Sequence, residues 1–203
     1  MVELLRLESC SITREGRLLP VMRDISLAVN EGERLLISGA SGVGKTTLAL
    51  LIAGLLKPSA GRRIQLPPMH QQPAPIRMIF QDPFASMNPR WKVRDWLKDN
   101  RALPADLRPA LDLCDQLELH PDLLEKRPLE LSGGECQRFN LIGAMLGNPL
   151  LLILDEATSM VDKQTALAMQ RLVEKRRADS GMAVVAIEHD AVVSSGQLNI
   201  QAG

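Results

Sequence analysis

Aromatic residues are scarce in this chain of 203 residues, which has three Phe, two Trp and no Tyr. A core with so few rings has to be built mainly from Leu, Ile, Val, Ala and Met, and the hydrophobic content of 45% supplies them. Base stacking on aromatic side chains is therefore poorly supported, which argues against proteins that bind single-stranded nucleic acid in that way.

Cysteine, net charge and long apolar runs are limited too. The three cysteines, Cys10, Cys114 and Cys136, lack the paired spacing of metal sites, and such a scattered odd set favours a reducing compartment. The 24 basic and 24 acidic residues balance, so we expect no general nucleic-acid binding. No apolar run approaches the roughly 20 residues of a membrane-spanning helix. Residues 1–10 show no signal-peptide pattern, so any membrane role is expected to come through a partner.

The order of strand and helix patterns predicts an α/β fold. Residues 4–12 and 25–39 have the composition of strands, joined by a polar turn around residues 14–17. The second segment ends in a short apolar run that leads into a glycine loop and then a helix over Thr46–Gly54. Residues 57–75, with five prolines and a glycine, predict a loop and a strand edge, and residues 76–80 predict another strand.

A mostly helical region interrupts this α/β pattern. It runs from residue 93 to about Glu125, with breaks at Pro104 and Pro121, and Leu107, Leu111, Cys114, Leu117 and Leu119 are spaced as one helix face. A helix ending at Gly147, a buried strand over 150–156, a helix over Lys163–Asp179 and a strand over 182–189 follow. We therefore expect one domain over 1–203, with a core of about 1–85 and 148–203 and an inserted helical lobe of about 86–147.

The segment "GASGVGKTT", Gly39 to Thr47, matches the pattern G-x-x-x-x-G-K-[ST] between a predicted strand and a predicted helix. Glycines let backbone N–H groups turn inward around a phosphate, and the helix N-terminus adds positive potential. Lys45 supplies a mobile charge for the β- and γ-phosphates, and Thr46 offers a hydroxyl to Mg²⁺. The alternative is a glycine-rich turn with an incidental lysine, which this context disfavours.

Two carboxylates end the apolar strand "LLLILDE". Asp155 suits a Mg²⁺ shell, and Glu156 suits orienting or deprotonating an attacking water. Taken alone, the pair is equally well explained as an acidic strand end, and the phosphate pattern in the same chain shifts the balance. Gln81 and His189 also follow predicted strands, but each alone is more simply read as an ordinary polar residue at a strand end.

The stretch "LSGGE" predicts a helix start with an unusual feature. Ser132 and Glu135 have the spacing of a capping box. The consecutive Gly133 and Gly134 weaken a helix unless something must approach the backbone closely. A glycine-rich helix N-terminus is also a site for anions, so this turn is a second candidate phosphate site.

Taken together, these motifs resemble the ATP-binding subunit of an ABC transporter in identity, order and spacing. "GASGVGKT" corresponds to Walker A, Gln81 to the Q-loop, "LSGGE" to the signature, "LLILDE" to Walker B, "SMVD" to the D-loop and His189 to the switch histidine. The resemblance implies a P-loop NTPase cassette with a mixed sheet core and an inserted helical lobe. It implies ATP and Mg²⁺ as cofactors.

The resemblance also implies that two such subunits pair head to tail, as a homodimer or heterodimer, with each ATP between one Walker A and the other signature. Glu156 is then the general base, His189 holds the γ-phosphate and water, and Gln81 senses Mg²⁺ beside Thr46 and Asp155. Asp162 crosses the dimer interface. The residues expected to touch nucleotide are Gly39, Ala40, Ser41, Gly42, Val43, Gly44, Lys45, Thr46 and Thr47, with Ser132, Gly133 and Gly134 reaching the partner's ATP.

Residues 79–97 and the run "KRPLELSGGECQR" resemble one subfamily, the importer ATPases for dipeptides, oligopeptides and nickel. This implies a peripheral subunit on the cytoplasmic face of the bacterial inner membrane. Its expected partners are two permease subunits and, indirectly, an extracytoplasmic substrate-binding protein.

Three features depart from the family pattern. No aromatic residue lies near Ser9–Arg17 to stack on adenine, and Ile12 is the expected replacement. The usual arginine after the signature is Gly143. The chain ends soon after His189, which is expected of a minimal cassette or of a shortened one. The missing aromatic and arginine keep one alternative open, a cassette with a structural or regulatory role and little hydrolysis. A second alternative is an ABC ATPase outside transport, although the spacing leaves no room for the coiled-coil insertion of repair types and the chain has one cassette where translation types usually have two.

Overall fold

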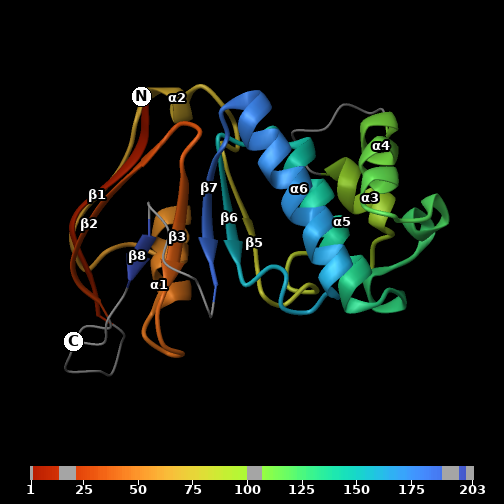
Figure 1. The fold of residues 1–203 in the computed structure, drawn as a ribbon, viewed down its shortest axis with the longest axis horizontal. Coiled ribbons are helices and arrows are strands. Elements are labelled where there is room, and N and C mark those ends of the chain that lie inside the picture. The colour runs from red at the N-terminus through yellow and green to blue at the C-terminus, as the bar shows by residue number, and fades with distance from the viewer. Residues whose placement is uncertain (1, 14–21, 100–106, 189–196, 200–203) are drawn as a thin grey trace.

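The computed structural model describes residues 2–13, 22–99, 107–188 and 197–199 and contains two sheets (Figure 1). The larger is parallel, with strand order β5-β6-β7-β3-β8. The smaller is antiparallel, with order β2-β1-β4. The parallel strands are β3 (Arg34–Ser38), β5 (Ile76–Ile79), β6 (Leu151–Asp155), β7 (Ala183–Ile187) and β8 (Gln197–Asn199); the antiparallel strands are β1 (Glu3–Ile12), β2 (Met22–Asn30) and β4 (Ala60–Gln65).

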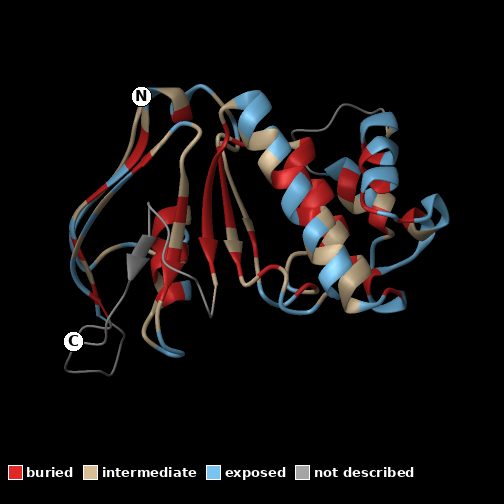
Figure 2. Cartoon of the chain, viewed as in Figure 1, coloured by how far each residue is buried: buried red, intermediate tan, exposed pale blue. Residues whose placement is uncertain are grey.

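The parallel sheet is covered on both faces, and its strands show why. In β6, Leu151 and Ile153 pack into a core shared with the antiparallel sheet and α1 (Lys45–Ala53), whereas Leu152 packs into a second core with the helices opposite. Successive side chains of a strand point to opposite faces, so a strand buried on both sides is apolar throughout. Figure 2 shows β7 buried along its length in this position.

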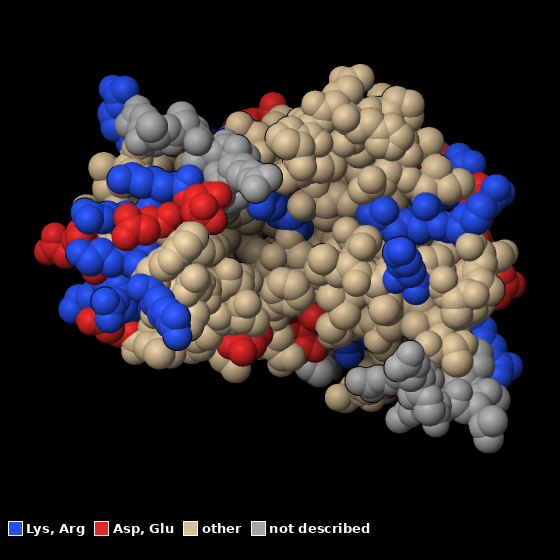
Figure 3. All heavy atoms as spheres, turned by 180° about the vertical axis from the view of Figure 1, so that it is seen from behind, with Lys and Arg blue, Asp and Glu red and all other residues tan. Residues whose placement is uncertain are grey.

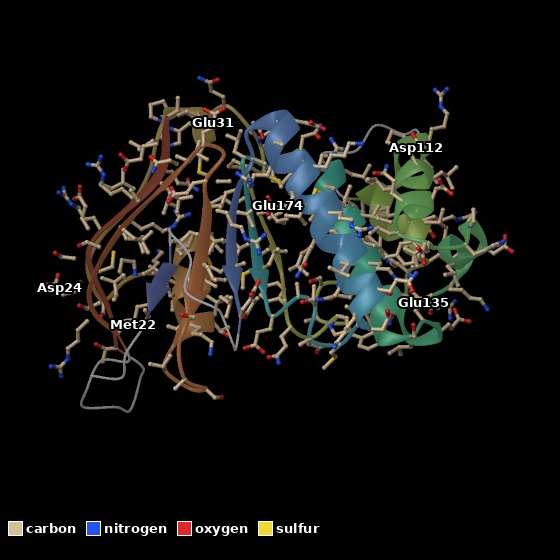
Figure 4. All side chains as sticks on the ribbon, in the orientation of Figure 1. Met22, Asp24, Glu31, Asp112, Glu135 and Glu174 are labelled. Atoms are coloured by element: carbon tan, nitrogen blue, oxygen red, sulfur yellow. The ribbon has the colours of Figure 1, made fainter. Side chains whose placement is uncertain are left out.

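The second core lies beneath α5 (Gly133–Leu146) and α6 (Lys163–Ser180), on the side of the parallel sheet away from the antiparallel one (Figure 1). Polar contacts also join α6 to the sheet, because Glu174 accepts hydrogen bonds from Arg34 of β3 and from Arg177. Figure 4 shows Glu174 on the side of α6 that faces the strands. Burial acts to raise the pKa of Glu174, but the two guanidinium groups outweigh it and hold that pKa below its usual value.

The expected helical region contains α3 (Val93–Asp99), α4 (Arg108–Gln116) and two short 3₁₀ turns, η1 (Pro121–Glu125) and η2 (Pro128–Glu130), which precede α5. The predicted helix face was wrong at one position, because Leu111 is 39% exposed and Leu113 is buried in its place. The buried residues of α4 and its end are Ala110, Leu113, Cys114 and Leu117. Their spacing follows the three- and four-residue steps of a helix counted from Ala110. Leu111, one position after Ala110, is rotated by about 100° from that residue and points away from the buried face.

The other predicted elements are confirmed, with local differences. Residues 25–39 form parts of β2 and β3 that are separated by a turn in which Gly32 has a φ of +68°. Residues 57–75 include β4, which is an edge strand, and the short helix α2 (Pro67–His70). Pro121 begins η1, since proline fits the first position of a helical turn. The predicted turn at 14–17 and the break at Pro104 lie outside the described residues. Within the described ranges, no helix has both the length and the apolar character to cross a membrane.

Candidate functional site

The candidate site lies at one edge of the parallel sheet, where the carboxyl ends of four neighbouring strands meet. Because β5, β6, β7 and β3 are parallel neighbours, the segments that follow them emerge together. Backbone hydrogen bonds tie these ends to one another: Glu188 N donates to Ile37 O over 3.3 Å, and Glu156 N donates to Ile187 O over 3.2 Å. The sheet thus brings the phosphate loop (residues 39–47), both carboxylates and the segment of Gln81 to one edge.

The phosphate loop has a backbone that side chains with a Cβ rarely adopt. Gly39, Gly42 and Gly44 have φ angles of +151°, +78° and +109°, and Gly44 caps the N-terminus of α1. These values need glycine, and they turn the backbone around a small volume. Lys45 is only 6% exposed, and its Nζ donates to Gly39 O over 2.7 Å and to Ala40 O over 3.3 Å. The lysine charge is therefore held within the loop. The other loop residues divide into an exposed group, Ala40, Ser41, Gly42 and Thr46, and a half-buried group, Gly39, Val43, Gly44 and Thr47.

Thr46 and Asp155 meet behind this loop. Thr46 Oγ1 donates to Asp155 Oδ1 over 3.2 Å, across 109 positions of sequence. Asp155 is 3% exposed, and burial raises its pKa, with the neighbouring Glu156 adding to the rise and the Thr46 hydroxyl and Lys45 opposing it. A buried carboxylate beside a hydroxyl, both hard oxygen ligands, suits a cation that is otherwise held by phosphate and water. The donor set therefore fits Mg²⁺.

Glu156 has a backbone φ of +49°, which is uncommon for a residue other than glycine. Its amide bonds to Ile187 O, and its carbonyl accepts from Ser159 N over 3.0 Å, so the turn after β6 is fixed on both sides. Non-glycine residues in this conformation concentrate at functional sites. Gln81 is exposed in the segment after β5, and His189 lies outside the described residues.

The signature turn, Leu131–Glu135, has the predicted capping box. Ser132 Oγ accepts from Glu135 N over 3.2 Å, while Glu135 Oε2 accepts from Ser132 N over 2.8 Å and from Ser132 Oγ over 2.9 Å. Neither Gly133 nor Gly134 has a positive φ. A Cβ on Gly133 would lie 3.8 Å from Pro83 Cγ, and one on Gly134 would lie 3.5 Å from Val161 Cγ1, which are ordinary contacts. Among the described residues, neither backbone angle nor packing therefore requires glycine at either position.

The signature turn is remote from the phosphate loop of the same chain. The loop between β3 and α1 and the N-terminal end of α5 lie on opposite sides of β6 and β7 in Figure 1, and the labelled Glu135 marks that helix end in Figure 4. Asp162, in the segment between β6 and α6, caps α6 by accepting from Gln164 N and Thr165 N over 2.9 and 3.0 Å.

The family model described as "ABC transporter" matches residues 22–159. The chain belongs to the ABC transporter family. The nickel import ATP-binding protein NikE of Escherichia coli O6:K15:H31 is 36% identical over 188 residues, which cover 84% of this chain and 69% of that protein. As a member of this family, the chain binds ATP and is an ATPase.

Solved structures of ABC cassettes share the fold. The cassette MJ0796, in a dimeric post-hydrolysis state bound to ADP and Pi, has a TM-score of 0.79 at 24% identity and covers 92% of this chain and 88% of its own. A putative ABC transporter ATP-binding protein from Pyrococcus furiosus has a TM-score of 0.79 at 21% identity and covers 97% and 96%. The expected fold, an ABC cassette of the P-loop NTPase type, is thereby confirmed.

The structure of this ABC ATPase also explains residues that the sequence left without an interpretation. Gly143, where the family has arginine, lies against the Trp96 ring: a Cβ there would be 2.5 Å from Trp96 Cη2. Cys136 and Asn140 both donate to Pro83 O, over 3.1 and 2.7 Å. For Gly143 the sequence signal was its departure from the family pattern, but only the fold shows that it faces Trp96.

One sequence interpretation of the site is wrong. Ile12 is 5% exposed and packs in the core shared by the two sheets, so it does not present a surface for adenine in place of the missing aromatic. The reason is its position in β1, where it pairs with Met22 of β2 and its side chain points inward.

Proposed function

We propose that two copies of this cassette, or one copy and a related subunit, enclose ATP between the phosphate loop of one protomer and the signature turn of the other. The observation that supports this most is the pair Gly133 and Gly134. Neither backbone angle nor internal packing calls for glycine there. Both glycines are half-buried at the capped start of a 14-residue helix, where the first backbone N–H groups have no partner within the helix and suit a phosphate that approaches from outside the chain.

The same proposal assigns the chemistry of hydrolysis. Water attacks the γ-phosphorus, its proton passes to Glu156, and the bond to the β–γ bridging oxygen breaks, which leaves ADP and phosphate. Lys45 and the loop amides neutralise the charge that builds on the phosphate oxygens. Thr46 and Asp155 would hold Mg²⁺ with Gln81, and that ion supplies further charge neutralisation. His189 would hold the γ-phosphate and the water, and Asp162 would reach the partner protomer.

We further infer that the whole chain, 1–203, is one cassette with a core of about 1–85 and 148–203 and a helical lobe of about 86–147.

A cleft of about 420 Å³ lies where β5, the turn after α1, α3 and α5 meet, with Leu55, Trp96 and Asn140 among its lining residues. The face seen in Figure 3 is hollowed near its middle. We place the contact with a permease subunit at this cleft, close to Gln81.

The cargo that we propose is nickel, a metal chelate or a peptide, imported through two permease subunits and delivered by an extracytoplasmic binding protein. Support comes from the relative named a nickel import ATP-binding protein and from the subfamily resemblance of residues 79–97. The cassette would then lie peripherally on the cytoplasmic face of the bacterial inner membrane.

A Glu156→Gln variant tests the catalytic proposal. We expect ATP hydrolysis to fall by about 10²–10⁴-fold, the range typical of losing a general base, and an ATP-bound dimer to accumulate. Steady-state hydrolysis and light scattering with and without ATP measure both effects. Unchanged hydrolysis, or a chain that stays monomeric with ATP in the variant, would overturn the assignment.

A further inference from the structure

The first two turns of α5 contact two catalytic segments through buried polar side chains. Gln137 is 1% exposed, and its Nε2 donates to Phe80 O over 3.1 Å and to Ala157 O over 2.9 Å. Phe80 immediately precedes Gln81, and Ala157 immediately follows Glu156. A single amide group therefore joins the backbones beside two residues with separate catalytic roles.

A neighbouring side chain fixes the orientation of that amide. Asn140 Nδ2 donates to Gln137 Oε1 over 3.3 Å, so the oxygen of Gln137 faces a donor and its nitrogen faces the two carbonyls. The same Nδ2 donates to Pro83 O over 2.7 Å. A flipped Asn140 amide would place an oxygen against these two acceptors, so the assignment is determined by the surroundings.

Cys136 adds a further contact to the same segment. Its Sγ donates to Pro83 O over 3.1 Å, and it is fully buried. Burial, together with the charge of Asp82, raises the pKa of this thiol to about 12, so it keeps the proton that it donates. Phe80 and Pro83 lie on either side of Gln81, which means that α5 holds the Q-loop at two points.

These contacts could simply satisfy buried carbonyl groups, as most polar groups in protein interiors must be satisfied. The positions of the donors and acceptors indicate a further role. The three side chains lie on the helix whose N-terminus is capped by Ser132, and their acceptors lie beside the proposed metal sensor and the proposed base. A displacement of the signature turn therefore moves both segments together.

We propose that Gln137 is a positioning residue that holds Gln81 and Glu156 in a fixed placement relative to the signature turn, with Asn140 orienting its amide. This rests on the roles proposed above for Gln81 and Glu156. Contact of the signature turn with the partner's ATP is transmitted along α5 and through the Gln137 amide to the two loops. Gln137 itself touches neither nucleotide nor water.

The decisive variant is Gln137→Met, which keeps a similar volume and removes both donated hydrogen bonds. We expect kcat for ATP hydrolysis to fall by about 10- to 100-fold, because small misplacements of catalytic groups have effects of this size. KM for ATP is expected to stay within about twofold of the parent value, since the phosphate loop is untouched. Gln116→Met on the exposed face of α4, where Gln116 Nε2 donates to Asp112 O of the same helix, is the matched control.

Amide hydrogen exchange provides a readout that does not depend on activity. Exchange at residues 80–84 and 156–158 should accelerate in Gln137→Met and not in Gln116→Met, while α1 stays protected. If Gln137→Met does not fold, Asn140→Ala takes its place, with faster exchange on both sides of Pro83 and a smaller fall in kcat. Unchanged exchange in both segments, or an unchanged kcat, would overturn the positioning role.

The outcome separates this inference from the proposed function. If the parent protein hydrolyses ATP in a manner that requires Glu156 and the Gln137 variant matches it, only the positioning role fails. If kcat and KM both worsen without local exchange changes, Gln137 acts through the fold as a whole, which also overturns the role. If Glu156→Gln leaves hydrolysis unchanged, the proposed function fails and the inference fails with it.

Discussion

The two glycine turns of this molecule, the phosphate loop and the signature turn, differ in how each would meet a phosphate under the proposed function. The phosphate loop needs its glycines for the backbone itself, because Gly42 and Gly44 have positive φ, and it encloses a buried lysine. The signature turn needs none of this: Gly133 and Gly134 begin an ordinary helix, capped by Ser132. Under the proposed function, the first turn binds a phosphate without help from another chain, whereas the second contributes only backbone that the partner's phosphate can approach. The proposed site is therefore divided between the phosphate loop, which needs no second chain to bind phosphate, and the signature turn, which does.

Removing Lys45 tests the phosphate loop and has the largest expected effect. In Lys45→Met, we expect hydrolysis to fall by about 10²–10³-fold or more, as when a preorganised charge partner of a reacting group is lost. Binding of a fluorescent ATP analogue to the monomer should weaken as well. If the monomer binds nucleotide as tightly as before, the phosphate loop does not act as the primary site.

A glycine-to-alanine substitution in each turn compares what the phosphate loop and the signature turn require of their glycines. Gly42→Ala places a Cβ at a φ of +78°, and we expect a cost of about 1–2 kcal/mol and weaker ATP binding by the monomer. Gly134→Ala should leave the fold and monomer binding intact, yet lower hydrolysis by about 10- to 100-fold because the partner's phosphate is displaced.

Thermal unfolding, nucleotide titration of the monomer and steady-state hydrolysis separate these two results. A Gly134→Ala protein with parental hydrolysis would mean that the signature turn is a helix start and nothing more. A Gly42→Ala protein that binds ATP normally would mean that the loop can hold phosphate in a different conformation.

The sequence predicted the phosphate loop better than the signature turn and its helix α5, for a physical reason. The spacing of glycine and lysine in residues 39–47 determines a local backbone, and the apolar run before Asp155 determines a buried strand. Both can therefore be predicted from short segments of the sequence. The contacts of α5 are not local: Gln137 meets Phe80 and Ala157, which are 57 and 20 positions away. The pairing of Gly143 with Trp96 and the inward position of Ile12 depend likewise on packing that no periodicity reveals.

The contact between Gly143 and Trp96 gives a smaller effect on stability. Gly143→Ala would bring a Cβ within 2.5 Å of Trp96 Cη2, and we expect overpacking to cost about 1–3 kcal/mol. Replacing the ring by a smaller side chain in the double variant Gly143→Ala, Trp96→Leu should recover part of that cost. Chemical denaturation of the parent, the two single variants and the double variant measures the coupling between the two positions. Strictly additive free energies of unfolding would show that the two residues do not constrain each other.

The buried thiols of Cys114 and Cys136 give the smallest effect, a difference in reactivity without a change in fold. Burial raises the pKa of Cys114 to about 11 and contributes most to the value of about 12 for Cys136. The thiolate is the reactive form, so the folded protein should react with iodoacetamide at pH 8 far more slowly at these positions than the unfolded chain does. Mass spectrometry of timed samples follows each cysteine separately. Because Cys136 donates to Pro83 O, faster labelling at that position in the Gln137→Met protein would report loosening of the Q-loop, whereas Cys114, on α4 away from that segment, should label at the parental rate.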